Sequence, residues 1–458
     1  MQGLPAAVQY CAVAILFLAS RLLLWLLGIR FESSALAWYW QVLDPALLRA
    51  NLVESLAYFH VQPPLFNLLI GVVAKGFPDP APVLAWLWTA CGLGMTLVIQ
   101  ATLRRVGWGP VAAGLAATAC ALSLPWIAYE NWLFYDFPCA ALLLLGGYCL
   151  LRDAGRGTHG WAAAFAAVLT ALAGTRSLFH LVWVLAAAAL FVAASAPATR
   201  RRAAAWMLAP VLLVASLYSW NLAVFGFFGS SSWMGQSLTK MTVDRLSPGE
   251  RAAWIRDGTL SPYAALASFS PLEAYEHAGG RRFPDDPIPV LGTRLRRSGH
   301  PNYNHRAFVE ISRIRLGDAL TVIARRPGLY AGAVGSALSR FFDSPVHYPP
   351  FKETLIILEP VYRIHAITFG TRPAAILVYA LALALAMATW LRRGTPMASG
   401  LRAAAAWATL NLVWVLVAGS LLEVGENHRF RFTVLPLAWL TILACMGTQA
   451  LRRPKAVP

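Results

Sequence analysis

Ionisable side chains gather at a few short links between apolar stretches of this chain. They lie in YENWLFYDFP (129–138), GTRSLFH (174–180) and EVGENHRFRF (423–432), and in a first polar loop over 29–81. Carboxylates beside arginines suit transfer from a phosphorylated donor. A carboxylate can take the proton of an acceptor hydroxyl, and guanidinium groups can stabilise a departing phosphate. Inverting transfer of a sugar is a single in-line displacement, so one carboxylate base suffices.

The first loop supplies the candidate base. Asp44 is the predicted general base, and the alternative is that it caps the short helix PALLRANL, because Asp followed by Pro is typical of a helix start. Glu54 is the second candidate base. Glu130 is expected to orient the acceptor or to hold a divalent metal with Asp44, or else to be a solvated charge at a helix end. Asp136 lies deeper in its apolar span, where burial disfavours a carboxylate unless a cation pairs with it.

Arginines near the same links are the predicted phosphate ligands, because guanidinium binds phosphate oxygens in a bidentate manner. Arg176 and Arg431 are expected to bind the donor phosphate, and Arg429 either joins them or is a boundary charge. Lys240 ends FGFFGSSSWMGQSLTK (225–240), which is either a phosphate cradle or an ordinary turn. Arg21, inside the first apolar stretch, either extends to the interface or contacts a lipid phosphate.

The wall of the expected cavity is assigned to polar residues around these charges. His60 and Gln62 in YFHVQPPLFNLLIG (58–71) are expected to face the cavity, with Leu65, Phe66 and Leu69 facing lipid. His428 is expected to be a hydrogen-bonding residue, as is His60, because neither has the spacing of a zinc site. Asp44, Glu130 and Arg431 are therefore expected to meet in one cleft on the outer side.

Composition sets the class of protein that carries these residues. The chain has 458 residues, of which 58% are hydrophobic and 13% charged, and its mean hydropathy is +0.57. That balance is typical of a polytopic membrane protein. The net charge of +17 comes from arginines between apolar spans and in one long loop, so we exclude nucleic acid as a partner. Six cysteines show no disulfide or zinc spacing.

About ten transmembrane helices are predicted, with both termini cytoplasmic. The expected spans are 8–28, 82–103, 110–128, 132–151, 161–175, 178–196, 204–222, 374–391, 404–423 and 431–450. Arginine clusters at 104–105, 200–202 and 392–393 mark the cytoplasmic side. The PPLFNLLIGVVAKGFP stretch is too short to span and is expected to lie at the membrane surface. The predicted parts are an N-terminal module 1–222, an outer segment 223–373 of mixed structure with helices over 305–342, and C-terminal spans 374–458.

Three stretches resemble a known family. QPPLFN (62–67) with His60, the acidic stretch Glu130 to Asp136, and Glu426, Arg429, Arg431 and Pro436 together resemble GT-C glycosyltransferases, particularly the group of protein O-mannosyltransferases and the aminoarabinose transferase of lipid A. The resemblance covers about the first 220 and the last 40 residues. It implies a GT-C helical bundle, a polyprenyl-phosphate sugar donor, a catalytic Asp in the first outer loop, and a helix after His60 at the wall of the active cavity.

The predicted function is therefore an inverting membrane glycosyltransferase of the bacterial inner membrane. Its donor would be a polyprenyl-phosphate sugar and its acceptor an extracytoplasmic glycan, lipid or protein, with membrane lipids as further partners. A transporter or a flippase for lipid-linked sugars is the alternative, but the sequence has no internal repeat and its acids lie at one edge of the bilayer. A non-catalytic assembly factor is the third possibility.

Overall fold

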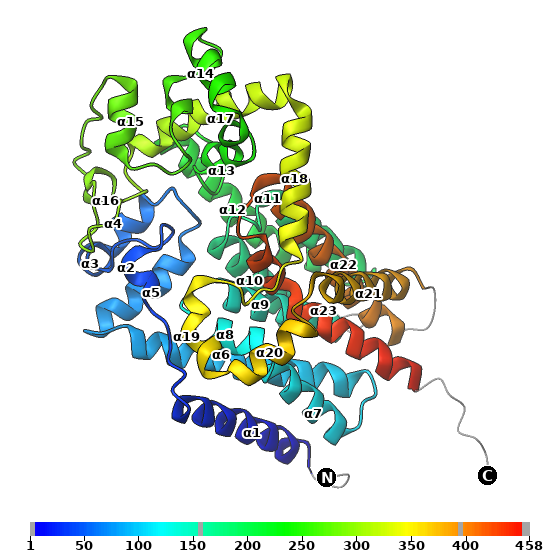
Figure 1. The fold of residues 1–458 in the computed structure, drawn as a ribbon. Helices are drawn as coiled ribbons and strands as arrows, with labels where there is room; N and C mark the ends of the chain where they lie inside the picture. The colour runs from blue at the N-terminus through cyan, green and yellow to red at the C-terminus, as the bar shows by residue number, and fades with distance from the viewer. Residues whose placement is uncertain (1–4, 154–158, 393–396, 451–458) are drawn as a thin grey trace, which may run out of the picture.

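The chain is all-helical. The computed structural model describes residues 5–153, 159–392 and 397–450, and within these ranges the only β-type pairing is two isolated bridges, Glu32 with Trp132 and Leu295 with Pro301. The helices form a bundle with a lobe above it in the view of Figure 1. The outer segment is thus helical as well, where the sequence predicted mixed structure.

Apolar helices make up the bundle. They are α1 (Ala6–Leu26), α6 (Ala81–Arg105), α7 (Pro110–Ala121), α8 (Leu124–Glu130), α9 (Asp136–Asp153), α10 (His159–Thr175), α11 (Leu181–Ala194), α12 (Arg200–Phe225), α21 (Arg372–Leu391), α22 (Met397–Leu422) and α23 (Asn427–Ala450). Each predicted span corresponds to a helix, except that the third is divided into α7 and α8 by a bend of 62°. Six of the described helices are long and apolar enough to cross a membrane, or seven with the bent pair. The chain is a multi-pass membrane protein, but the predicted number of ten spans is not confirmed.

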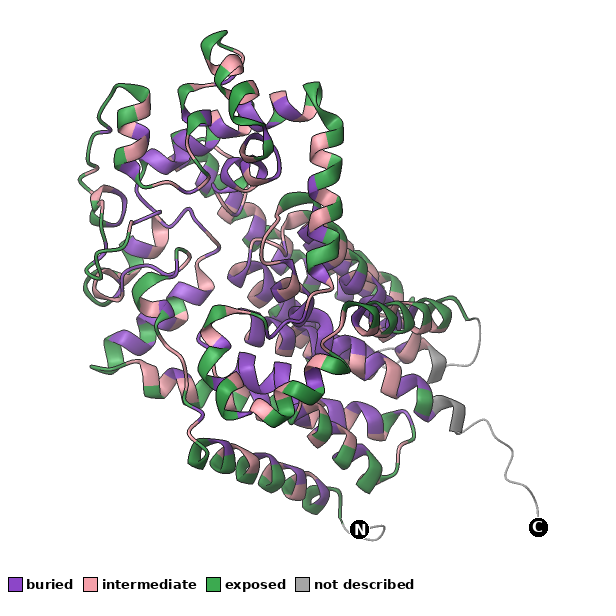
Figure 2. Cartoon of the chain, viewed as in Figure 1, coloured by how far each residue is buried: buried purple, intermediate pink, exposed green. Residues whose placement is uncertain are grey.

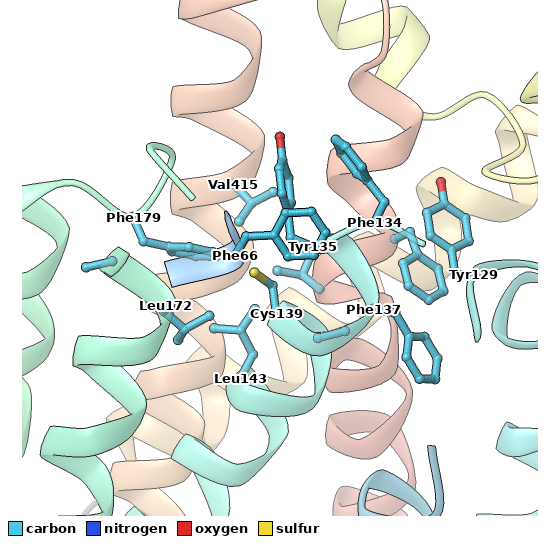
Figure 3. Packing of buried hydrophobic residues seen from close by; sticks show 14 of the residues in the cluster. Phe66, Tyr129, Phe134, Tyr135, Phe137, Cys139, Leu143, Leu172, Phe179 and Val415 are labelled. Carbon is cyan, nitrogen blue, oxygen red and sulfur yellow. The ribbon is translucent and has the colours of Figure 1, made fainter. Parts of the chain in front are cut away.

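The first outer loop folds into short helices. They are α2 (Ala35–Trp38), α3 (Pro45–Ala50), α4 (Leu52–Ala57) and α5 (Leu65–Gly76). Helix α5 follows Pro63 and Pro64 and has only 12 residues, too few to span. Phe66 does not face lipid as predicted. It is buried and packs edge-on against the rings of Phe134 and Tyr135 (Figure 3). It also packs edge-on against Trp88, because α5 inserts its apolar face into the bundle.

The outer segment forms the lobe and returns to the bundle. It contains α13 (Met234–Met241), α14 (Pro248–Arg256), α15 (Leu272–Gly279), α16 (Pro289–Gly292), α17 (Ala307–Arg325), α18 (Pro327–Phe341), α19 (Lys352–Ile357) and α20 (Glu359–Ile367). Helices α17 and α18 confirm the helical periodicity over 305–342. Helix α13 packs closely on α17, where a Cβ at Gly235 would lie 1.8 Å from the Ser312 carbonyl oxygen. This position therefore requires glycine.

One hydrophobic core extends through both parts. The largest cluster of buried residues includes Trp183 and Trp407 in the bundle as well as Phe283 and Tyr303 in the outer segment. Figure 2 shows the buried residues concentrated where the bundle helices meet, whereas α1 is mostly exposed along its length. Helix α18 packs against α22 and α23 and so ties the lobe to the C-terminal helices. The division into 1–222, 223–373 and 374–458 stays a prediction.

Candidate active site

A cavity of about 500 Å³ lies where the first outer loop, the outer segment and three interhelical links meet. Its charged lining residues are Arg176, Lys240, Glu423, Glu426 and Arg429. Aromatic rings and small polar groups complete the wall, among them Trp38, Tyr39, Trp40, Gln41, Gln62, Tyr135, Ser177, Ser230, Ser231, Trp233, Ser237, Phe269 and Tyr348. Charged and aromatic groups thus converge from segments that are far apart in the sequence, as a binding site requires.

Two buried arginines share one buried carboxylate at this cavity. Asp136, the first residue of α9, is fully buried and pairs with Arg176 from the link between α10 and α11. Its second oxygen lies 3.6 Å from Nε of Arg429, in the first turn of α23. Thr433 Oγ1 accepts a hydrogen bond from Arg176 at 2.9 Å. Asp136 therefore neutralises part of the positive charge of the two arginines, which lie buried with little access to water.

Both arginines keep donors that no described protein group uses. Nη2 of Arg176 has no hydrogen-bond acceptor, nor do Nε and Nη1 of Arg429. The ring of Phe430 lies 4.6 Å from the guanidinium carbon of Arg176 and 5.8 Å from that of Arg429. Buried N–H groups without acceptors are costly. These N–H groups are themselves buried although both arginines line the cavity, so an anion in the cavity would supply acceptors once the guanidinium groups turn toward it.

Two carboxylates of the link between α22 and α23 line the cavity with different environments. Glu423 pairs with Lys240 of α13 at 3.0 Å, and burial raises the pKa of Glu423 although the charge of Lys240 opposes this. Glu426 accepts from Arg429 at 2.8 Å and from the Tyr348 hydroxyl at 2.7 Å. Burial alone would raise the pKa of Glu426, but Arg429 and Tyr348 outweigh it and leave this pKa lowered. Glu423 is therefore the stronger base of the two.

A hydrogen-bond chain extends from Glu426 to the first outer loop. Tyr39 donates to the hydroxyl of Tyr348 at 2.6 Å, and Tyr348 in turn donates to Glu426. Burial raises the pKa of both tyrosines, so both stay protonated and act as donors. Tyr39 also packs on the rings of Trp38 and Phe134 at 4.5 Å. These hydrogen bonds from Tyr39 to Tyr348 and from Tyr348 to Glu426 hold the Glu426 carboxylate in place.

The predicted base Asp44 does not line this cavity. One carboxylate oxygen accepts from the Ala46 amide at 2.8 Å and the other from the Arg297 amide at 2.7 Å. Asp44 is thus the N-cap of α3, which was the alternative interpretation, because Pro45 begins the helix. Glu54, the second candidate base, lies exposed on α4 and also does not line the cavity.

Glu130 is likewise outside the cavity, in a separate buried ion pair. It binds Arg21 of α1, whose Nε lies 2.9 Å from Oε1, and Trp126 donates to Oε2 at 2.9 Å. A Cβ at Gly92 would lie 2.8 Å from the same oxygen, so only glycine admits the carboxylate here. Arg21 therefore joins α1 to α8 rather than extending to the interface. No group of three or more His, Cys, Asp or Glu residues within the described ranges is placed to hold a metal ion.

Arg431 also does not line this cavity, so none of Asp44, Glu130 and Arg431 is among its lining residues. Arg431 is buried and donates to the Asp343 carbonyl at 2.8 Å, since its position in α23 faces the other side from Arg429. His428 is half-buried near the ring of Tyr348, at a centroid distance of 6.1 Å, and does not line the cavity.

The histidine and the glutamine of the first loop differ in their placement. Gln62 lines the cavity and accepts from the Ser177 amide at 3.2 Å. His60 is fully buried away from the cavity, with Nδ1 2.8 Å from Ser232 Oγ and Nε2 3.0 Å from the Asn304 carbonyl oxygen. Burial lowers the pKa of His60 to about 3, so this neutral ring joins the first loop to the outer segment. In the 225–240 stretch, Ser230, Ser231, Ser237 and Lys240 do line the cavity.

Sequence reasoning missed the aromatic wall. Trp38, Tyr39 and Trp40 come from the single run AWYWQ (37–41), and Tyr348 comes from an irregular segment before α19. Three adjacent aromatic residues next to a glutamine in a polar outer loop were the available indication, because such a run has no helical or strand periodicity that would bury all of it.

Comparisons with known proteins give the following result. No family model matches the chain, and no curated protein matches it. Two solved structures are similar in their helical arrangement. They are the crystal structure of ArnT from Cupriavidus metallidurans bound to undecaprenyl phosphate, with 14% identity over 95% of this chain and 77% of that one at a TM-score of 0.35, and the same protein in the apo state, with 15% identity over 97% and 78% at a TM-score of 0.34.

Proposed function

We propose that this protein is a membrane glycosyltransferase that moves a sugar from a polyprenyl-phosphate donor to an acceptor hydroxyl. The observation that carries the proposal is the pair Arg176 and Arg429, both buried, both lining the cavity and both with unused N–H donors, beside two carboxylates. The proposed location is the bacterial inner membrane, with both termini in the cytoplasm and the cavity on the outer side, as the loop arginines indicate.

The arginines would bind the donor phosphate. Their unused N–H groups are the donors that phosphate oxygens accept, and Lys240 lies on the same wall. Apolar residues that line the cavity and are also exposed on the outside of the protein, namely Phe228, Met234 and Leu422, offer a surface for the prenyl chain. A lipid-linked donor suits this combination, because its head is anionic and its tail is apolar.

Glu423 would be the general base. The acceptor oxygen attacks the anomeric carbon, the bond from that carbon to the phosphate oxygen breaks, and Glu423 takes the acceptor proton, so the configuration is inverted. Glu423 is favoured over Glu426 because burial raises its pKa although Lys240 and Ser237 oppose this, whereas Arg429 and Tyr348 lower the pKa of Glu426. It is favoured over Asp44 because Asp44 lies outside the cavity with both oxygens bound to backbone amides.

The charge balance of the site fits this step. Arg176, Arg429 and Lys240 are matched by Asp136, Glu423 and Glu426, so the wall is formally neutral before reaction. When Glu423 takes a proton, one positive charge remains unmatched. At that moment the phosphodiester becomes a phosphomonoester and gains one negative charge. The wall thus becomes more positive as the leaving group becomes more negative, which stabilises the transition state more than the bound donor.

The test uses purified protein in lipid nanodiscs with a panel of polyprenyl-phosphate sugars labelled in the sugar. Wild type is expected to release or transfer the label, and Glu423→Gln is expected to lower the rate about 100-fold or more. Glu54→Gln, an exposed carboxylate outside the cavity, is the matched control and is expected to keep the wild-type rate. No cleavage of any donor by wild type, or equal rates in wild type and Glu423→Gln, contradicts the proposal. Movement of intact donor across a vesicle bilayer would instead support the flippase alternative.

A further inference from the structure

The aromatic run of the first outer loop lines the cavity with unused binding capacity. Trp38 and Trp40 are 36% and 40% exposed although they lie at a cavity wall, so part of each indole is open to a ligand. Gln41, beside them, lines the same cavity. Within the described residues, neither the indole N–H of Trp40 nor the side-chain amide of Gln41 forms a hydrogen bond. The Trp38 ring is stacked on Tyr39, and the Trp40 ring packs against Phe269 and Tyr303, so each indole presents its remaining exposed surface. Exposed indole surface next to a free amide suits a sugar ring, which has apolar C–H faces and equatorial hydroxyls.

This run is held rigidly from both sides. Asn67 of α5 accepts from the Leu43 amide at 2.8 Å and donates to the Gln41 carbonyl at 2.9 Å. From the outer segment, Arg296 donates to the Tyr39 carbonyl at 2.9 Å. Trp38 also donates its indole N–H to Ser34 Oγ at 2.6 Å. A ligand that stacks here would meet rings already in place, so little ordering entropy would be lost on binding.

A series of contacts connects Trp40 to the proposed base. Trp40 packs against Phe269 at a centroid distance of 4.8 Å, and Nζ of Lys240 lies 5.1 Å from the centre of the Phe269 ring. Lys240 in turn pairs with Glu423. The sequence of contacts from Trp40 through Phe269 and Lys240 to Glu423 therefore joins the open aromatic surface to the carboxylate that would receive the acceptor proton.

We propose that Trp38, Trp40 and Gln41 form a saccharide subsite, and that the acceptor presents a sugar ring there rather than a peptide or an unglycosylated lipid. The assignment of this ring as the acceptor rests on the proposed glycosyl transfer, because only the position of Glu423 distinguishes acceptor from donor. The binding of a saccharide at the subsite does not rest on it. The exposed surfaces of the two indoles supply apolar contact, and the free amide of Gln41 supplies directed hydrogen bonds.

The test measures saccharide binding without any donor. Protein in nanodiscs, free of glycoside detergents that would compete, is dialysed to equilibrium against a panel of tritiated short oligosaccharides built from hexoses, N-acetylhexosamines or pentoses. Wild type is expected to bind at least one of them. Trp40→Ala is expected to weaken that binding about tenfold, and Trp40→Phe, which keeps an aromatic face, by less. Trp86→Ala, which removes an exposed tryptophan of α6 outside the cavity, is expected to bind as wild type does.

The outcomes separate this inference from the proposed function. If no oligosaccharide in the panel binds to wild type, the subsite is overturned, even if donor cleavage is observed. Equal binding by wild type, Trp40→Ala and Trp40→Phe overturns it as well. Binding that Trp40→Ala weakens supports the subsite even if no donor in the panel is cleaved, in which case only the proposed reaction fails. Size-exclusion profiles of the variants, compared with that of Trp86→Ala, show that the protein remains folded.

Discussion

Lys240 and Glu423 form an ion pair at 3.0 Å although 183 residues separate them in the sequence. Lys240 belongs to α13 of the outer segment, and Glu423 follows α22 of the bundle. The contact therefore joins the two parts of the molecule at the cavity wall. It also sets the protonation of the proposed base, because the charge of Lys240 opposes the effect of burial on Glu423.

The pH dependence of transfer is the first prediction. The base must be ionised to take a proton, so the rate is expected to fall as pH decreases through the pKa of Glu423, which lies above that of an ordinary glutamate. Lys240→Met removes a charge that lowers this pKa, so the acid limb of the profile is expected to move to higher pH. The measurement is the initial rate of sugar transfer from pH 4 to pH 9. An acid limb that stays in place in Lys240→Met would show that another group is the base.

Asp136 and Arg176 give a prediction about stability. Arg176→Ala leaves the fully buried Asp136 with a weaker partner, and the loss of one member of a buried ion pair costs about 3–5 kcal/mol. The double variant Arg176→Gln with Asp136→Asn removes both charges and is expected to regain most of the stability, but not donor binding. Thermal unfolding and donor retention on nanodiscs measure the two effects. Arg256→Gln, at an exposed arginine of α14, is the control.

If the double variant cleaves the donor at the wild-type rate, Arg176 does not bind the phosphate. Equal stability of the single and double variants would show instead that Asp136 finds sufficient compensation in Arg429 alone, which lies 3.6 Å from its second oxygen.

Asp44 gives the prediction that separates a helix cap from a base. Asp44→Asn keeps an oxygen that can accept from the Ala46 amide but loses the acceptor of the Arg297 amide, so a modest loss of stability is expected while the transfer rate per folded molecule stays close to wild type. Asp44→Ala removes the cap and is expected to cost about 1 kcal/mol. Unfolding temperature and turnover are measured on the same preparations. Loss of turnover per folded molecule in Asp44→Asn would restore Asp44 as the base.

Arg21 and Glu130 provide a second buried pair, away from the cavity. Arg21→Ala leaves Glu130 buried beside Trp126 without a cation and is expected to destabilise the protein by about 3–5 kcal/mol. Adding Glu130→Gln to Arg21→Met removes both charges and is expected to recover most of that loss. The transfer rate per folded molecule is expected to stay unchanged in the double variant. A selective loss of turnover in it would place Glu130 in the reaction after all.

The helices were largely predictable from sequence, and the partners of the charged residues were not. Apolar runs favour helices in a bilayer, so nine of the ten expected stretches correspond to one helix each and the stretch 110–128 corresponds to the bent pair α7 and α8. Arginine clusters on alternate links marked the cytoplasmic side of the bundle. The remaining links, which carry Arg176, Arg429 and Asp136, were therefore expected to lie together on the outer side. Hydropathy does not show how a helix is rotated about its axis, and so it does not show which side chains face a cavity. This rotation places Arg429 at the cavity and Arg431 at the Asp343 carbonyl.

The first loop shows the same limit in another form. Asp44 followed by Pro45 already indicated a helix cap, and the structure has one. Glu130 could not be assigned, because its partner Arg21 is 109 residues away and is brought near only by the packing of α1. The run AWYWQ was not recognised, since aromatic residues in a membrane protein are as typical of the bilayer interface as of a binding site.

The link that contributes Glu423, Glu426 and Arg429 lies between α22 and α23, far along the chain. During synthesis, Arg176 and the aromatic residues Trp38, Tyr39 and Trp40 are made well before these three residues. The nascent protein therefore holds no assembled reaction centre until its C-terminal helical hairpin has been inserted and packed. A half-made chain therefore lacks the two carboxylates and the second arginine that the proposed transfer requires.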